Sequence, residues 1–283
     1  MDETIEVKPI AGNIGAEIFG VDLSKDLSQE TFSQIYKAWL DHLVIFFPDQ
    51  DLSIEDQSRF ATRFGPLHHD KYFAAPEGHP ELLKVIKAVD EKIVFGENWH
   101  SDSTYMTKPP KASFLYAKEV PAKGGDTMFA NQYLAYESLS PGMRKFFDGL
   151  VGIHSAQTIH NAFLHRSPMK REMKYNTENV DLGNPEIEEH PVVRTHPDTG
   201  RKAIYVSRSY VRRFKDWTEE ESQPIIQWLY NHCTRPEFTC RYRWKVGSLG
   251  IWDNRCAQHK PVADYDGQRR VMHRMTVIGD DPS

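Results

Sequence analysis

Cysteine is scarce in this sequence, and long apolar runs are missing. The three cysteines, Cys233, Cys240 and Cys256, are odd in number and lie near the C-terminal end, so we expect buried thiols and no framework of disulfides. No run approaches the length of about eighteen apolar residues that a transmembrane helix needs. The first ten residues lack the basic and apolar regions of a signal peptide. These absences predict a protein of the reducing cytoplasm with no membrane partner.

Basic residues are not in excess either. The chain has 35 Lys and Arg against 40 Asp and Glu, a net charge of -5, so nucleic acid is not an expected partner. Hydrophobic residues (39%) and aromatic residues (12%) are frequent enough to form a core and argue against disorder. No internal repeat or low-complexity tract divides the chain. Because β-sandwiches and barrels of this length are common as single domains, we predict one domain over residues 1–283.

Short strands dominate the predicted secondary structure. Strands are expected where β-branched and aromatic residues lie between turn residues, and helices where a Ser or Thr cap precedes apolar residues at helical spacing. The predicted strands lie within 7–24, 43–48, 190–207, 238–244, 248–254 and 269–279, and the predicted helices within 28–43, 53–64, 140–150 and 218–233. This pattern is typical of a mainly β protein with flanking helices (α+β) around a double-sheet jelly roll.

One long segment fits neither pattern. Residues from about 156 to 189 have poor periodicity and mixed charge, and a stretch of this kind in a compact domain is usually a lid or an insert. The overlapping part at 152–176 is rich in His, Lys and Arg, so it is either a cationic cover for an anion site or a solvated loop. Elsewhere, His190 and His232 are expected at the surface and His196 in a turn.

Two histidines and an aspartate stand out as candidate metal ligands. His100 and Asp102 lie in NWHSDSTY, and His259 lies in WDNRCAQHK. On a strand, residues at i and i+2 point to the same face, so His100 and Asp102 would converge, and His259 could approach from a facing strand. Two imidazoles and one carboxylate form the facial triad of non-haem Fe(II), which leaves three positions open. With thirteen histidines in the chain, the alternative is a chance occurrence of His-x-Asp.

Arginines on a later strand suggest the ligand of such a metal. Arg270 follows His259 by eleven residues, and a guanidinium fork suits a carboxylate. Arg270, Met272 and Arg274 share one face of the predicted strand. One arginine could therefore hold a 2-oxoacid that chelates iron, and the other an anionic substrate. The alternative is a solvated strand edge whose basic residues oppose aggregation.

Several segments, in order along nearly the whole chain, resemble the taurine/phenoxyacetate dioxygenase family of Fe(II)/2-oxoglutarate-dependent oxygenases. They are GAEIFGVDLS, FGPLHH, NWHSDSTY, GGDTMFAN, HPVVRTHPDTGRKAIYV, FTCRYRW, WDNRCAQH and RRVMHRMTVIGD. The resemblance implies a double-stranded β-helix core with His100, Asp102 and His259 as iron ligands. It also implies that Thr127 and Arg270 bind 2-oxoglutarate and that Arg274 meets the anionic group of the primary substrate.

The resemblance further implies the reaction. With Fe(II), 2-oxoglutarate and O2, such an enzyme hydroxylates a small anionic organic substrate and releases succinate and CO2. If the hydroxylated carbon carries a sulfonate, sulfate ester or aryloxy group, the adjacent C–S or C–O bond then breaks. The iron supplies the difficult chemistry, and the protein orients the substrate and excludes water. Members of the family often form dimers or tetramers, so a homo-oligomer is expected.

The substrate pocket departs from the taurine enzymes of the family. Those enzymes carry His-x-x-Tyr after the FG-x-L segment, whereas here His69 and Tyr72 follow with one residue fewer between Leu67 and the tyrosine. Their taurine-type Asn corresponds to Gly96. Both departures disfavour taurine itself. The remaining candidates for the pocket wall are His69, Tyr72, Tyr105 and Tyr210, although tyrosines at strand ends are also common in cores.

Two other classes of protein would use the same residues. A zinc-dependent hydrolase can be built on two histidines and an aspartate, but it would not need Thr127 or Arg270 and would place a base beside the metal. A non-catalytic jelly-roll binding protein could retain the fold without turnover. The dioxygenase consumes 2-oxoglutarate and oxygen, whereas the hydrolase ignores both.

Overall fold

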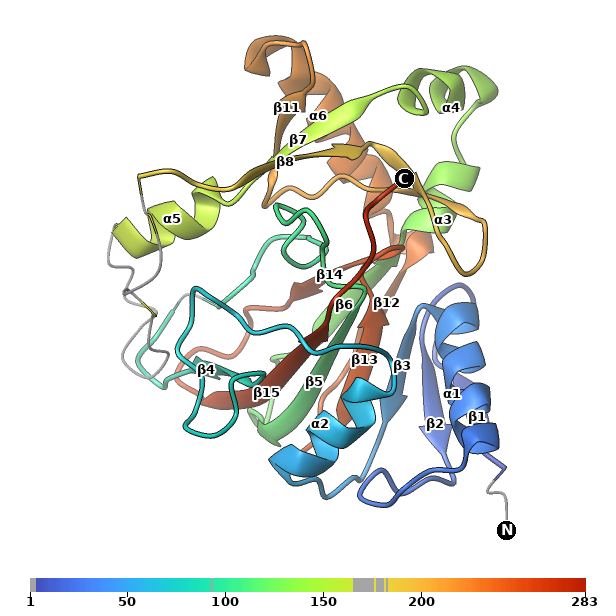
Figure 1. Cartoon of the computed structure of the whole chain (residues 1–283), viewed down its shortest axis with the longest axis vertical. Helices are drawn as coiled ribbons and strands as arrows, with labels where there is room; N and C mark the ends of the chain where they lie inside the picture. Colours follow the sequence, from blue (N-terminus) through green and yellow to red (C-terminus); the bar gives the residue numbers. More distant parts are fainter. Residues whose placement is uncertain (1–3, 93, 165–175, 177–180, 182) are drawn as a thin grey trace.

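The computed structural model describes residues 4–92, 94–164, 176, 181 and 183–283 (Figure 1). Its largest unit is a seven-stranded sheet with the order β1-β2-β3-β13-β5-β15-β4. The strands are β1 (Glu6–Pro9), β2 (Ala16–Phe19), β3 (Val44–Phe47), β13 (Leu249–Asp253), β5 (Ala112–Glu119), β15 (Arg270–Val277) and β4 (Leu83–Lys87). Only the β2–β3 pair within this sheet is parallel.

A smaller antiparallel sheet faces the large one. Its order is β12-β6-β14, with β12 (Thr239–Tyr242), β6 (Thr127–Asn131) and β14 (Ala257–Pro261). Side chains from both sheets share one hydrophobic cluster, in which Phe46 on β3 stacks on Tyr242 of β12 at 3.6 Å between ring centroids. The candidate site lies in this space between the sheets.

Two helices cover the outer face of the large sheet. Helices α1 (Gln29–His42) and α2 (Ile54–Thr62) lie beside it in Figure 1. In β3, Val44 and Phe46 point between the sheets, whereas Ile45 and Phe47 pack with the helices. Because both faces of β3 are covered, the strand is apolar throughout, as in a fully buried strand.

The remaining elements lie in the upper half of Figure 1. The sheet β11-β7-β8 and the hairpin β9–β10 lie there. The strands are β7 (Val151–Ser155), β8 (Ile187–Pro191), β9 (Val193–Thr195), β10 (Lys202–Ile204) and β11 (Val211–Phe214); the helices are α3 (Gln132–Glu137), α4 (Pro141–Phe147), α5 (Gln157–Leu164), α6 (Glu219–Cys233) and the 3-10 turn η1 (Pro236–Phe238). None of the helices in the described ranges is long and apolar enough to cross a membrane.

Most predicted elements are confirmed. Ser28, Ser53 and Thr218 cap α1, α2 and α6, and each side-chain hydroxyl accepts a hydrogen bond from the first turn of its helix. The predicted hairpin at 190–207 is present as β9 and β10. Cys233, Cys240 and Cys256 are free and buried, as expected. Two facing, mainly antiparallel sheets with flanking helices match the predicted class.

Two expectations need correction. His100 and Asp102 do not lie on a strand: His100 forms one isolated bridge with His259, and a turn follows. His190 and His232 are buried, because the Nε2 of each bonds to a distant carbonyl, of Met106 and Ala135 respectively. The lid or insert at about 156–189 stays a prediction: Gln157–Leu164 form helix α5, and residues 165–175, 177–180 and 182 lie outside the described residues.

Candidate active site

A local backbone pairing brings the two predicted histidine ligands together. The His100 amide donates to the His259 carbonyl at 3.0 Å, and the His259 amide donates to the His100 carbonyl at 2.8 Å. The two imidazole centroids are therefore 4.2 Å apart. His259 comes from β14 of the smaller sheet, and His100 from the connection between β4 and β5.

Asp102 completes the group. Its Oδ1 lies 3.6 Å from Nε2 of His100 and 3.8 Å from Nε2 of His259, and all three side chains are buried. The Nδ1 atom of His100 lies 2.7 Å from the carbonyl oxygen of Asn98. Because Nδ1 can only donate to a carbonyl, the Nε2 lone pair is left for a metal. One potential ligand atom from each residue lies within 4.8 Å of the others, so the donor set fits Fe(II).

The protonation states also suit metal binding. Burial alone would raise the pKa of Asp102, but the Arg274 guanidinium and the His259 and His100 imidazoles hold it well below its ordinary value. Burial, assisted by His100, lowers the pKa of His259 well below its ordinary value. An ionised carboxylate and a neutral imidazole are the forms that bind metals.

A second buried group, His196, Asp253 and Cys256, has metal-like spacing but is filled by an arginine. Arg255 Nε and one terminal nitrogen donate to the two carboxylate oxygens of Asp253 at 2.9 and 2.8 Å. The His196 imidazole pairs with the same carboxylate at 2.9 Å. The carboxylate is therefore already neutralised, and the group is a structural ion-pair network that joins the β9–β10 turn to the end of β13.

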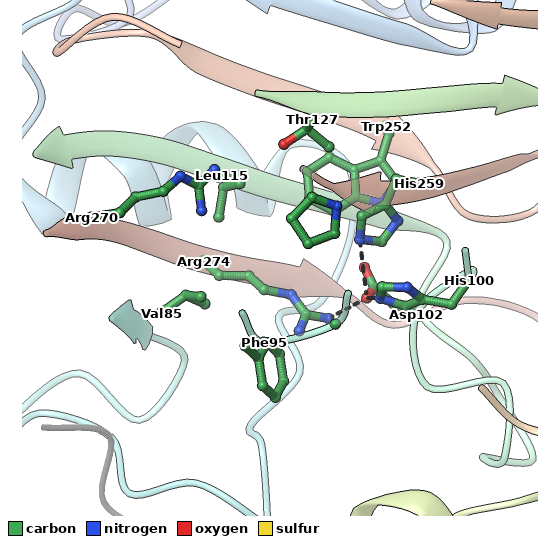
Figure 2. A pocket seen from close by; sticks show the side chains of 12 residues that line it. Val85, Phe95, His100, Asp102, Leu115, Thr127, Trp252, His259, Arg270 and Arg274 are labelled. Atoms are coloured by element: carbon green, nitrogen blue, oxygen red, sulfur yellow. Dashed lines mark ion pairs between the residues drawn. The ribbon is translucent and has the colours of Figure 1, made fainter. Parts of the chain in front are cut away.

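The triad opens into a cavity between the two sheets (Figure 2). Thr127 on β6 and both Arg270 and Arg274 on β15 lie on its wall. The cavity is lined by Val85, Phe95, Gly96, His100, Asp102, Leu115, Thr127, Trp252, His259, Pro261, Arg270 and Arg274. The predicted alternation along β15 thus places both arginines on the inner face.

The two arginines differ in their partners. Arg274 forms an ion pair with Asp102 Oδ1 at 2.9 Å, as Figure 2 shows. Arg270 is only 4% exposed, and among the described residues neither its Nε nor one of its terminal nitrogens has a hydrogen-bond partner. Burial lowers the Arg270 pKa. A buried cation without such partners is costly unless an anionic ligand joins it.

Thr127 can donate a hydrogen bond to the same anionic ligand as Arg270. The indole Nε1 of Trp244 donates to Thr127 Oγ1 at 2.9 Å. Because an indole N–H can only donate, the Thr127 oxygen is the acceptor, and its own proton remains available to an anion in the cavity. Thr127 and Arg270 therefore offer a hydroxyl and a guanidinium to one ligand.

The four residues predicted for the wall of the substrate pocket differ in burial and in the side chains they contact. Tyr105 and Tyr210 are buried, with ring centroids 5.3 Å apart, and Tyr210 lies 6.3 Å from the His100 ring. Tyr72 packs on Tyr105 at 5.9 Å, and its hydroxyl meets His160 and Glu186. His69 is exposed, and neither it nor any of the three tyrosines is among the residues that line the cavity.

Sequence reasoning missed His68, the neighbour of His69. A small pocket adjoining the cavity is lined by His68, Asp70 and Arg274 together with Glu81, Leu83, Ser103 and Thr276. The backbone amide of His68 donates to the Thr276 carbonyl on β15 at 2.8 Å, which fixes the loop against that strand. The loop has no regular period, so the sequence could not indicate which of the two histidines faces inward.

Comparisons with known proteins agree with this geometry. The family model described as "Taurine catabolism dioxygenase TauD, TfdA family" matches residues 6–276. An alpha-ketoglutarate-dependent sulfate ester dioxygenase from Pseudomonas putida is 37% identical over 98% of this chain and 91% of its own length. An alkylsulfatase from Acinetobacter baylyi is 34% identical over 98% of this chain and 86% of its own.

Solved structures support the same assignment of the fold. A taurine dioxygenase from Burkholderia xenovorans has a TM-score of 0.82 and 36% identity, with 98% of this chain and 90% of that chain covered. The structure of AAD-2 in complex with Mn(II) and N-oxalylglycine has a TM-score of 0.81 and 29% identity, with 99% of both chains covered. The predicted jelly-roll core is confirmed by these likenesses.

Proposed function

The chain belongs to the taurine catabolism dioxygenase TauD, TfdA family, and we propose that its substrate is an alkyl sulfate ester or a closely related small organic anion. Its reaction class is that of the Fe(II)/2-oxoglutarate-dependent dioxygenases. The observation that carries the proposal is one cavity with a His/His/Asp group and two arginines; Arg270 is buried, and two of its nitrogens have no hydrogen-bond partner among the described residues. The comparisons favour this function over the zinc hydrolase and the non-catalytic binding protein.

The residues of the cavity fall into groups with different proposed roles. His100, Asp102 and His259 would hold Fe(II), which, once bound, supplies the activation of oxygen while 2-oxoglutarate supplies two electrons. Arg270 and Thr127 would orient 2-oxoglutarate through its distal carboxylate. Arg274 would meet the anionic group of the substrate. The apolar walls, including Phe95 and Leu115, would exclude water from the reacting carbon.

The sulfate ester class is favoured by relatives and by the cavity wall. Two relatives above 30% identity are named for sulfate esters, and the wall near Arg274 includes apolar Val85 and Phe95. Gly96 has a φ of +73°, and a Cβ there would lie 2.9 Å from His100 Cε1. An asparagine could not replace this glycine without shifting a metal ligand, so the taurine-type contact is disfavoured.

The chemistry balances for a sulfate ester. One oxygen atom of O2 enters succinate, and the other becomes a hydroxyl on the carbon that bears the ester oxygen. That carbon then forms a carbonyl as its C–O bond to sulfate breaks, so an aldehyde and a sulfate anion leave. The electron pair of the broken bond stays with sulfate, and the hydroxyl proton is released.

The test is a two-stage assay. Anaerobic titration of the Fe(II)-loaded protein with 2-oxoglutarate should produce a weak visible charge-transfer band. Succinate release with oxygen should then be greater with a linear alkyl sulfate than with taurine, an alkanesulfonate or an aryloxypropionate. Sulfate release that needs neither 2-oxoglutarate nor oxygen would overturn the proposal in favour of a hydrolase, and a preference for another anion would overturn the substrate class.

We further propose that residues 1–283 form one catalytic domain and that the protein is a cytoplasmic dimer or tetramer. The family resemblance supports the oligomer, and the free buried cysteines are compatible with a reducing compartment. Light scattering coupled to gel filtration measures the oligomeric state directly. A monomer at micromolar concentration would contradict the oligomer.

A further inference from the structure

Asn254 accepts two hydrogen bonds behind the candidate metal ligands. The Trp252 indole Nε1 and the Asp102 backbone amide each donate to Asn254 Oδ1 at 3.0 Å. Both groups can only donate, so the Asn254 atom that faces them must be the oxygen. The amide nitrogen of Asn254 therefore points the other way, and it donates to Ser113 Oγ at 2.8 Å.

The direction of these bonds determines where the Ser113 proton goes. Since the Ser113 oxygen accepts from Asn254, its own proton is free to donate, and Asp102 Oδ2 lies 2.5 Å away. Ser113 and Asn254 are at most 1% exposed, so solvent does not compete. Strand pairing places them together, because Ser113 on β5 lies opposite Trp252 on β13.

The two oxygens of Asp102 consequently have different surroundings. Oδ2 accepts the short bond from Ser113, whereas Oδ1 faces both imidazoles and Arg274. We propose that Ser113 and Asn254 are positioning residues that restrict Asp102 to one-oxygen coordination of the metal through Oδ1. This inference rests on the proposed function. A charge-assisted hydrogen bond to Oδ2 fixes the plane of the carboxylate and opposes its rotation onto the metal.

One-oxygen coordination by Asp102 matters because the metal has few free coordination positions. Three protein ligands leave three positions of an octahedron, and a chelating 2-oxoacid with oxygen would use all of them. A second oxygen from Asp102 would occupy one. Ser113 and Asn254 thus keep the third position open without touching the metal, the co-substrate or the substrate.

The experiment uses Mn(II), whose bound waters can be counted by water-proton relaxivity without turnover. In the Mn(II)-loaded wild-type protein we expect three waters on each ion. In Ser113→Ala, Asp102 should bind through both oxygens and displace one water, so relaxivity per bound ion should fall by about a third. Ser222→Ala is the matched control, because Ser222 is also fully buried and hydrogen-bonded but lies on α6.

A second variant tests the hydrogen bond between Ser113 and Asp102 by changing Asn254, the other hydrogen-bond partner of Ser113. In Asn254→Asp, a carboxylate oxygen replaces the amide nitrogen that faces Ser113. The Ser113 proton should then turn toward residue 254 and leave Asp102 Oδ2 without a donor, so the same loss of relaxivity is expected. This variant decides the question if circular dichroism shows that Ser113→Ala does not fold.

The outcomes separate the two proposals. Wild-type relaxivity in a folded Ser113→Ala or Asn254→Asp protein that binds Mn(II) would overturn the restriction and leave the proposed function intact. Loss of Mn(II) binding in a folded variant would also overturn it, because Ser113 would then govern affinity and not coordination mode. Failure of the wild-type protein to bind Mn(II) would instead count against the proposed function.

Discussion

Replacing Arg270 with methionine should have opposite effects on the protein with and without 2-oxoglutarate. Arg270 is buried, and two of its nitrogens lack hydrogen-bond partners in the described structure. Methionine keeps an unbranched stem but removes the charge. Without 2-oxoglutarate, Arg270→Met should be at least as stable as the wild type, because a buried cation without compensating bonds is lost.

With 2-oxoglutarate, the same variant should lose most of its ligand-induced stabilisation. One charge-assisted hydrogen bond contributes about 1.5–3 kcal/mol, so affinity should fall roughly ten- to hundredfold. At a concentration about 100 times the wild-type Kd, ligand binding stabilises the wild type by about 2.7 kcal/mol. The same concentration should stabilise the variant by only about 0.4–1.4 kcal/mol, while Mn(II) binding changes little.

Thermal unfolding of the Mn(II)-loaded protein, with and without 2-oxoglutarate, measures both effects. Arg269→Met is the matched control, because Arg269 immediately precedes β15, is not among the residues that line the cavity and pairs with Glu119. An equal ligand-dependent shift in Arg270→Met and the wild type would refute the carboxylate clamp. An equal loss in Arg269→Met would show that general charge, and not this site, attracts the ligand.

Three further predictions concern the metal, acid stability and the buried ion pairs. His100→Ala should abolish succinate formation and strongly weaken Mn(II) binding measured by calorimetry; unchanged affinity would count against the triad. Burial and two nearby lysines lower the pKa of His273 in the folded protein from 6.5 to about 4. Between these two pH values, His273 is therefore protonated in the unfolded chain but largely neutral in the folded protein. The free energy of unfolding should therefore fall between about pH 6.5 and 4, by at most about 1.4 kcal/mol per pH unit from this residue; an identical urea-denaturation profile for His273→Gln would contradict this. Arg255→Met should lower the free energy of unfolding, measured by urea denaturation, by about 3–5 kcal/mol, because Asp253 would remain buried with its main counter-charge lost. A decrease below about 1 kcal/mol, which is typical of a surface ion pair, would contradict the structural role.

The metal-binding group was predictable from sequence, but its local geometry was not. The spacing of His100 and Asp102 and the later His259 indicate the donor set. The expected strand is absent because Ser103, with a φ of +47°, lies in a turn. The convergence instead comes from the backbone bridge between His100 and His259, a pairing between residues far apart in sequence that no local pattern reports.

The other differences between prediction and structure arise from hydrogen-bond partners that lie far apart in the sequence. His190 and His232 are polar residues with no local partner, so a surface position was the natural expectation. Each can be buried because its Nε2 has a hydrogen-bond partner far away in the sequence, the carbonyl oxygen of Met106 for His190 and that of Ala135 for His232. Ser113 and Asn254 also escaped notice, since neither residue type marks a metal site and only the sheet register brings them to Asp102.

The inward side of β15, by contrast, was predictable, because side chains alternate between the two faces of a strand. Arg270 and Arg274 point into the same cavity, four residues apart, so their Cα atoms are separated by about 13 Å along the strand. Arg274 has Asp102 beside it, whereas Arg270 lies toward Thr127 and Trp244. The cavity therefore suits two anionic ligands bound together, which a dioxygenase with a 2-oxoacid co-substrate needs and a hydrolase that uses water does not.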